Sequence, residues 1–474
     1  MLVIDGMGPQ ESASSGYPRT YDHPYFGQLL LGGILKLIGY PNLYYSEISV
    51  HSIEILHLIP RLVVGILSVL DTYLVYKITE IRYSRKIALI AAILFAVMPM
   101  TWIFRRVLLD TLLMPFFLTS ILFALYAGTL GKTGSISSNN INKKVLILLS
   151  GLFLGLAIYT KVPTFTFIPL VGGIIYFNSR SARHLMMWLV PVFLIPLLWP
   201  LYAVSIGQGD LWAHWVLWQT ERNKPLQFSL ISFFQIDPVI AIGGTAGIIF
   251  ACLRKDFFPL VWVAPFLIFS FFIGWVQYFH LIVLFPAFCI AFAVLLDSIQ
   301  MKLISMGKKI ASNIMIISVF TFGIVITTTL ITLNVNSANY AIHASIAGHL
   351  PNDGNVTMIG SHWWDWNTYW LTKLVMHKDH QIIDPFFDRN FNDAVKTDKV
   401  LFINDPIFSE ALSNKIRGVD INEIRRLYNL SNPVSIIVDN MTSNVSANYP
   451  FNILHTMIEN ENHPQGTVEI RTNY

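Results

Sequence analysis

Charged residues are scarce in this sequence. Only 13% of its 474 residues are Asp, Glu, Lys or Arg, about half of the ~25% that is usual in soluble domains. So little charge argues against an ordinary soluble enzyme. A disordered or collagen-like chain is also excluded, because 54% of the residues are hydrophobic and 14% are aromatic. This composition favours a protein with several membrane spans, in which lipid covers the apolar surface.

Cysteine is nearly absent as well. Cys252 and Cys289 both lie in apolar runs, so we expect neither a disulfide framework nor a zinc site of paired cysteines. No basic patch with interleaved aromatic residues occurs, which argues against nucleic acid as a partner. No nucleotide-binding loop is visible either, so we expect no nucleotide cofactor.

Long apolar runs are abundant instead. Lys and Arg gather in alternate connections between them, 13 on one side against five on the other. The positive-inside rule places the richer set in the cytoplasm. We therefore expect a multi-pass protein of the cell (plasma) membrane, an α-helical fold with about ten transmembrane helices. The ten runs that are long enough, or nearly so, for a core of about 30 Å are 56–77, 87–104, 107–128, 145–160, 163–177, 185–203, 229–252, 257–274, 279–297 and 310–332.

The charge balance divides the chain into unlike parts. Residues 1–332 carry 22 Lys and Arg against 13 Asp and Glu, whereas residues 333–474 carry 10 against 15. The tail alternates β-type runs (VTMIG, VLFIND, SIIVDN) with helical stretches (NEIRRLYNL, FNILHTMIEN), and it contains four Asn-x-Ser/Thr sequons. It is therefore predicted to be a small extracytoplasmic α/β domain. Residues 56–332 are the predicted transmembrane domain, and residues 1–55 a first extracytoplasmic loop.

The N-terminal region contains one shorter apolar stretch. Residues 26–39, FGQLLLGGILKLIG, are too short to span the membrane upright, which predicts an interfacial helix. A tilted span is the alternative. If residues 1–55 lie outside, an earlier helix must bring them there, so we expect one further transmembrane helix before Met1.

Polar residues concentrate at the outer ends of the predicted spans. Asp22 and His23 precede the short helix and could hold a divalent metal ion or orient a phosphate, although Asp22 could equally cap the helix. Arg105, Arg106 and Asp110 lie in FRRVLLDTLLMPFF, where Asp110 is about one turn from Arg106 and can pair with it. Ionisable groups in membrane segments are usually functional, and the planar fork of Arg suits phosphate. A purely structural Arg–Asp pair is the alternative.

Three further features lie on the same predicted side. Lys161 stands between two short spans, either as a snorkelling lysine or as a charge directed at a lipid phosphate. His280 lies at the mouth of another span, where packing against aromatic neighbours is the alternative. The segment 211–222, LWAHWVLWQTER, predicts an interfacial aromatic belt, with a platform for a lipid or a sugar as the alternative.

The order of these motifs resembles the GT-C polyprenyl-phosphate-sugar glycosyltransferases, in particular the protein O-mannosyltransferase and aminoarabinose-transferase group. The most specific match is residues 105–117, which resemble the family pattern S-R-x-x-L-L-D-x-x-L-x-F-F. Residues 155–161 match G-L-A-x-x-T-K, and residues 22–24 stand where the family has H-P-P or E-K-P before a juxtamembrane helix. Residues 279–286 match the late R-Y-x-L-P-x-x-P motif loosely. The resemblance covers about residues 20–290 and the plan of a C-terminal outer domain.

The resemblance implies an activity and its partners. A sugar on a polyprenyl (dolichyl-type) phosphate would pass, with inversion, to a hydroxyl acceptor on protein, glycan or lipid at the outer face of the membrane. The residues that would bind the lipid phosphate are His23, Arg105, Arg106, Lys161 and His280. A transporter or flippase, or a non-catalytic relative, is the alternative. The absence of an internal repeat and the gathering of charge at one face favour the enzyme.

The resemblance also implies carboxylate roles, with one departure. In the family, an Asp of an Asp-Glu pair in the first outer loop is the catalytic base, and this chain lacks that pair. Asp5 is the candidate equivalent, or else the base lies outside this chain. Asp22 would orient a metal ion or the phosphate, and Asp110 would position Arg106.

Overall fold

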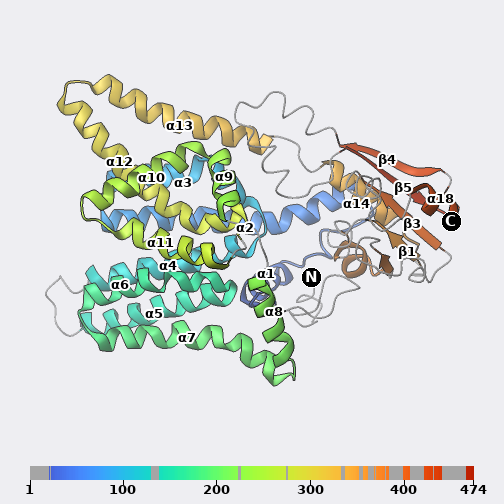
Figure 1. Ribbon diagram of the computed structural model, residues 1–474, viewed down its shortest axis with the longest axis horizontal. Helices are drawn as coiled ribbons and strands as arrows, with labels where there is room; N and C mark the ends of the chain where they lie inside the picture. The colour runs from blue at the N-terminus through green and yellow to red at the C-terminus, as the bar shows by residue number, and fades with distance from the viewer. Residues whose placement is uncertain are drawn as a thin grey trace. The chain divides into compact units, whose positions relative to one another are not determined.

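The computed structural model is mainly helical (Figure 1). It divides into two compact units, which are described separately. The first unit comprises Tyr21–Gln28 and Arg61–Leu333, and the second comprises Leu29–Pro60 and the described part of Asn334–Tyr474. The predicted division into 1–55, 56–332 and 333–474 stays a prediction. The structure describes residues 21, 23–129, 138–221, 226–273, 276–332, 337–351, 356–360, 368, 370–378, 381–383, 399–405, 421–430, 432–439 and 466–474.

Apolar helices build the first unit. The short helix expected near the N-terminus is α1 (Phe26–Leu37), and α2 (Val50–Arg82) follows it; the boundary between the units falls within each. The other helices are α3 (Arg85–Val97), α4 (Leu109–Thr129), α5 (Ser138–Thr160), α6 (Ile168–Ser179), α7 (Ala182–Ser205), α8 (Gly209–Glu221), α9 (Leu226–Ile236), α10 (Pro238–Leu253), α11 (Phe258–Ile273), α12 (Phe285–Ser305) and α13 (Lys309–Thr332), with short 3₁₀ helices η1 (Pro99–Arg105), η3 (Val162–Phe167) and η4 (Tyr278–Leu284).

The chain is a multi-pass membrane protein, as its apolar runs predict. Within the described residues, seven helices are long and apolar enough to cross a membrane, or eight if the bent pair α9–α10 counts as one. The run 229–252 forms this pair, which bends by 112°. Pro238 has no N–H with which to continue α9, and the Asp237 carboxylate accepts the Ile240 N–H at 2.9 Å and starts α10.

Small residues allow the helices to approach closely. A Cβ added at Gly247 of α10 would lie 2.3 Å from the carbonyl oxygen of Ala291 in α12, and one added at Gly151 of α5 would lie 2.4 Å from that of Trp188 in α7. Close backbone contact at small residues is how membrane helices commonly associate. This close contact fixes the helices relative to one another, and so it also fixes the turns at their ends.

Prolines end two of the helices at one end of this bundle. Met98, which precedes Pro99, has extended backbone angles and terminates α3, and η1 follows. Lys161 is likewise extended, and η3 begins after it with Pro163 in its first turn. The residue before a proline avoids the helical region, and proline itself tolerates only the first turn of a helix. Both helix ends therefore become short turns that carry polar side chains.

The second unit contains a five-stranded sheet of order β2-β1-β3-β5-β4. Strands β2 (Gln381–Ile383), β1 (Val356–Ile359) and β3 (Lys399–Asn404) are parallel, whereas β5 (Gly466–Thr472) pairs antiparallel with β3 and with β4 (Pro433–Asp439). Helix α14 (Ser337–His349) supplies Ile342 and Ile346 to the core on one face. The predicted α/β domain is thus confirmed, including a helix in NEIRRLYNL, α18 (Ile421–Leu427). The stretch FNILHTMIEN lies outside the described residues.

Candidate functional site

Three turns at helix ends bring together residues that are far apart in the sequence. Arg106 follows η1 and Asp110 lies in the first turn of α4; Lys161 lies between α5 and η3, and His280 lies in η4. Asp110 and Lys161 are buried, Arg106 and His280 are half-buried, and all four belong to the first unit.

Asp110 and Lys161 form a buried ion pair. Lys161 Nζ lies 2.5 Å from Asp110 Oδ2, and the two residues are 5% and 3% exposed. The sequence predicted Arg106 as the partner of Asp110, whereas the ion pair that the structure shows is the one with Lys161. Arg106 has an extended backbone and precedes α4, which begins at Leu109, so the spacing rule for two residues on one helix does not apply to it.

Arg106 is held instead by η4. Its Nη1 donates a hydrogen bond to the Tyr278 hydroxyl at 3.1 Å. Its guanidinium carbon lies 5.9 Å from the centre of the Phe279 ring, and Lys161 Nζ lies 5.8 Å from the same centre. The Phe279 ring therefore lies within cation–π range of both Arg106 and Lys161.

His280 is oriented by its own turn. The Gln277 N–H donates to His280 Nδ1 at 3.2 Å, and the Gln277 side chain in return accepts the His280 backbone N–H. Because Nδ1 is an acceptor here, the neutral imidazole carries its proton on Nε2. His280 is thus prepared to donate a hydrogen bond from Nε2.

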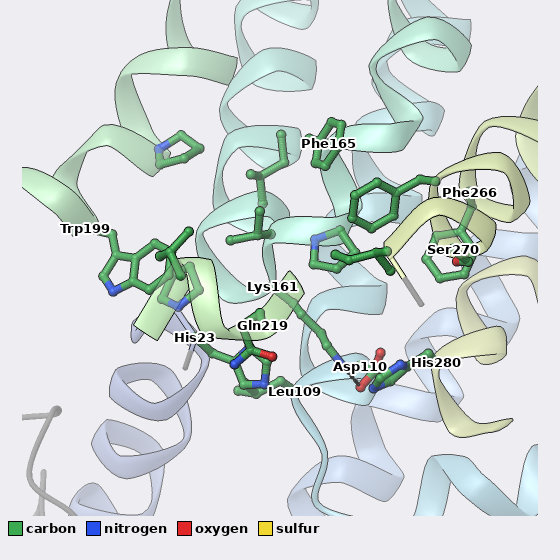
Figure 2. A pocket seen from close by; sticks show the side chains of 18 of the residues that line it. His23, Leu109, Asp110, Lys161, Phe165, Trp199, Gln219, Phe266, Ser270 and His280 are labelled. Carbon is green, nitrogen blue, oxygen red and sulfur yellow. Dashed lines mark hydrogen bonds and ion pairs between the residues drawn. The ribbon is translucent and has the colours of Figure 1, made fainter. Parts of the chain in front are cut away.

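A pocket of about 930 Å³ adjoins these residues. Most of its lining is apolar, and α7, η3 and α11 contribute Phe193, Phe165 and Phe266 to it. Figure 2 shows the Asp110–Lys161 pair and His280 in this lining. A cavity of this size that is largely apolar with a few convergent polar groups is typical of a ligand site. The seven polar residues that line it are His23, Asp110, Lys161, Gln219, Ser270, Gln277 and His280.

The remaining predicted site residues are only partly described. His23 lines the pocket. Asp5, Asp22 and the side chain of Arg105 lie outside the described residues, so a metal ion held by Asp22 and His23 stays a prediction. In the part of the chain that the structure describes, no group of three or more His, Cys, Asp and Glu side chains could hold a metal ion.

Comparisons with known proteins were made for the whole chain. Residues 19–208, less than half of it, match the family model of the dolichyl-phosphate-mannose-protein mannosyltransferases. ArnT from Cupriavidus metallidurans in the apo state is similar in structure, with a TM-score of 0.57 and 13% identity over 96% of this chain and 88% of that one. The same ArnT bound to undecaprenyl phosphate gives a TM-score of 0.57 and 12% identity over the same shares.

The oligosaccharyltransferase from Archaeoglobus fulgidus, solved with a tethered acceptor peptide, is also similar, with a TM-score of 0.53 and 13% identity over 84% of this chain. Only 64% of that enzyme is covered, so this chain spans less than two thirds of its length. No curated protein sequence matches the chain.

The chain has the GT-C glycosyltransferase fold. Together with the family match over residues 19–208, this fold supports a membrane glycosyltransferase. The matched segment includes Arg106, Asp110 and Lys161.

Sequence reasoning did not single out several residues of this site. Tyr278 was not expected there. Phe279 was matched only loosely to a family motif, and Gln219 lay in the segment 211–222, for which a platform for a lipid or a sugar was the alternative to an aromatic belt. Trp212, Val216 and Gln219 of α8 all line the pocket. Their spacing of four and three residues is the signal that could have found them, because such residues share one face of a helix.

Proposed function

We propose that this chain transfers a sugar from a polyprenyl (dolichyl-type) phosphate to a hydroxyl acceptor on protein, glycan or lipid. The observation that carries the proposal is the pocket: a long apolar lining with the Asp110–Lys161 pair and His280 in it, and Arg106 beside Lys161 across the Phe279 ring. This arrangement suits an amphipathic donor with an anionic head group. Solved structures of the same fold hold undecaprenyl phosphate (ArnT) and dolichol phosphate (AglB, the oligosaccharyltransferase of Archaeoglobus fulgidus).

The proposed reaction is a single displacement with inversion. The acceptor oxygen attacks the anomeric carbon while its proton passes to a carboxylate base. The bond between the anomeric carbon and the phosphate oxygen breaks, and the polyprenyl phosphate leaves with the electron pair. Negative charge thus develops on the phosphate, where Lys161, Arg106 and His280 Nε2–H would stabilise it. Asp5 stays the predicted base.

Asp110 is proposed as a positioning residue. Its carboxylate pairs with Lys161 in a buried site, which makes it an anchor for the Lys161 ammonium. The side that carries the site, and the C-terminal domain, are proposed to face outward from the plasma membrane, since the basic connections fall at the opposite ends of the spans.

The test is transfer of a labelled sugar from a polyprenyl-phosphate donor by the full chain in lipid nanodiscs. Arg106→Ala and Lys161→Ala are expected to lower the rate by about 100-fold, as loss of a transition-state hydrogen-bond donor does. Lys302→Ala, on the far end of α12, is the matched control and should keep the wild-type rate. The transporter would be favoured by one outcome: the wild-type protein binds polyprenyl phosphate and moves it across the bilayer, yet transfers no sugar from any donor.

A further inference from the structure

The pocket has a second group of polar side chains, distinct from the ion pair. Figure 2 shows His23 and Gln219 on one side of the Lys161 side chain, and Asp110 with His280 on the other. We call His23, Trp199, Trp212 and Gln219 the neutral end of the pocket. Because Lys161, Arg106 and His280 are proposed to bind the phosphate, the neutral end is left for another part of the substrate.

Helix α8 contributes to the neutral end from one of its faces. Trp212, Val216 and Gln219 recur at the spacing of a single helical stripe and all line the pocket. The start of α8 is anchored, since the Tyr21 hydroxyl donates to Gln208 Oε1 at 2.5 Å and the Trp199 and Trp212 rings meet edge to face at 5.6 Å. Trp199 is only 6% exposed. Gln219 therefore projects from a fixed helix, as a residue that selects a ligand must.

The chemistry of this end suits a ring that carries hydroxyl groups. The Gln219 amide is both donor and acceptor, as is a neutral imidazole, so each can pair with a hydroxyl in either sense. The indole rings offer flat apolar surfaces of the kind that pack against the C–H face of a ligand. The side chains of Trp199, Trp212 and Gln219 carry no formal charge. A charged group placed there would lose its hydration without gaining an ionic partner.

We propose that the neutral end is the sugar subsite of the donor and that it selects a neutral sugar over an amino sugar. The inference rests on the proposed function, because the phosphate has to occupy the charged end for the sugar to reach Gln219. Gln219 would contact the sugar hydroxyls, and the Trp199 and Trp212 rings would form the wall beside them.

The test compares two ligands on the full chain in nanodiscs: polyprenyl phosphate alone, and the same lipid phosphate carrying mannose. The wild type should bind the mannosyl form about 10-fold more tightly. Gln219→Ala should lose this 10-fold gain in affinity, which corresponds to one or two hydrogen bonds, yet bind polyprenyl phosphate as the wild type does. Lys161→Ala should weaken the binding of both ligands. Gln300→Ala, on α12 away from the pocket, is the matched control and should change neither.

A second variant tests the charge preference. Gln219→Glu has nearly the same shape but adds a carboxylate. The ratio of its affinity for a polyprenyl-phosphate amino sugar to its affinity for the mannosyl form should be about 10-fold higher than the same ratio in the wild type. Equal binding of mannosyl and sugar-free lipid by the wild type, or an intact increment in Gln219→Ala, would overturn the subsite. Failure of the proposed function looks different, because the wild type would then bind neither lipid, or would bind polyprenyl phosphate and transfer no sugar from the mannosyl form.

Discussion

A lysine and an aspartate buried against each other at the end of a helical bundle set the energetics of the site. The Asp110–Lys161 pair is almost fully enclosed, and taking two charges out of water costs about as much as their attraction returns. The pair therefore adds little net stability. Its value lies in holding the Lys161 ammonium at one position beside the Phe279 ring.

This balance predicts how single and double variants differ. Asp110→Leu should lower the free energy of unfolding by about 3–5 kcal/mol, because it leaves a buried charge without its partner. The double variant Asp110→Leu/Lys161→Met should recover most of that loss. Thermal unfolding in detergent measures both. Sugar transfer should be lost in both, so a double variant that is stable and fully active would remove the pair from the site.

At the scale of elements, the break between α9 and α10 ties the site's turns together. One Asp237 carboxylate oxygen caps α10, and the other accepts the Met100 N–H of η1 at 3.3 Å. In α9, the Ser229 hydroxyl donates to the carbonyl oxygen of Val276, shortly before η4, at 2.5 Å. The bend therefore anchors η1, which leads to Arg106, and the segment that leads to His280.

Asp237→Ala is expected to loosen this anchor. It leaves two backbone N–H groups without their acceptor, each of which costs about 1–3 kcal/mol when buried. The rate of transfer should fall through displacement of Arg106, whereas the affinity for sugar-free polyprenyl phosphate should change less. Asp297→Ala, which removes the partly exposed pair with Lys86, should cost less than about 1 kcal/mol. Equal losses of stability in the two variants would contradict the anchor.

The contact between α10 and α12 gives a second prediction at this scale. Gly247→Val would place carbon atoms against the Ala291 backbone, where even a Cβ would lie 2.3 Å from the carbonyl oxygen. Backbone cannot yield as a flexible side chain can, so the variant should lower the melting temperature and the yield of folded protein. Gly65→Ala, at a helical position with nothing within 4 Å, should be neutral or slightly stabilising. Circular dichroism of the two purified variants checks the contrast.

At the scale of the whole molecule, the distribution of charge predicts the topology. Single cysteines at Lys308, between α12 and α13, and at Thr467 of β5 should react from opposite sides of the membrane. The measurement is labelling of inside-out and right-side-out vesicles with an impermeant maleimide, in a chain whose Cys252 and Cys289 are replaced by alanine. Reaction of both cysteines from the same side would contradict the proposed placement of the C-terminal domain.

Periodicity and hydropathy predicted the helices and the strands of the tail well, because both follow from burial of apolar side chains. The site was harder to predict. Arg106 was proposed from its cost in a membrane, and Lys161 and His280 from their place at the outer ends of spans and from the family resemblance. Lys161 was not expected as the partner of Asp110, because the short η1 before α4 leaves no trace in the apolar pattern. Gln219 was missed because its helix was interpreted as an aromatic belt, and only the fold shows which face of α8 borders a pocket.

The ion pair has a consequence for how the chain enters the membrane. Helices α4 and α5 are consecutive and packed together, and Asp110 and Lys161 lie at the open end of the hairpin that they form. A hairpin inserted as one unit carries its lysine and its aspartate across the bilayer as a neutral couple, whereas either helix alone would have to translocate an isolated charge. We therefore expect the pair that holds Lys161 in place also to favour insertion of these two helices together.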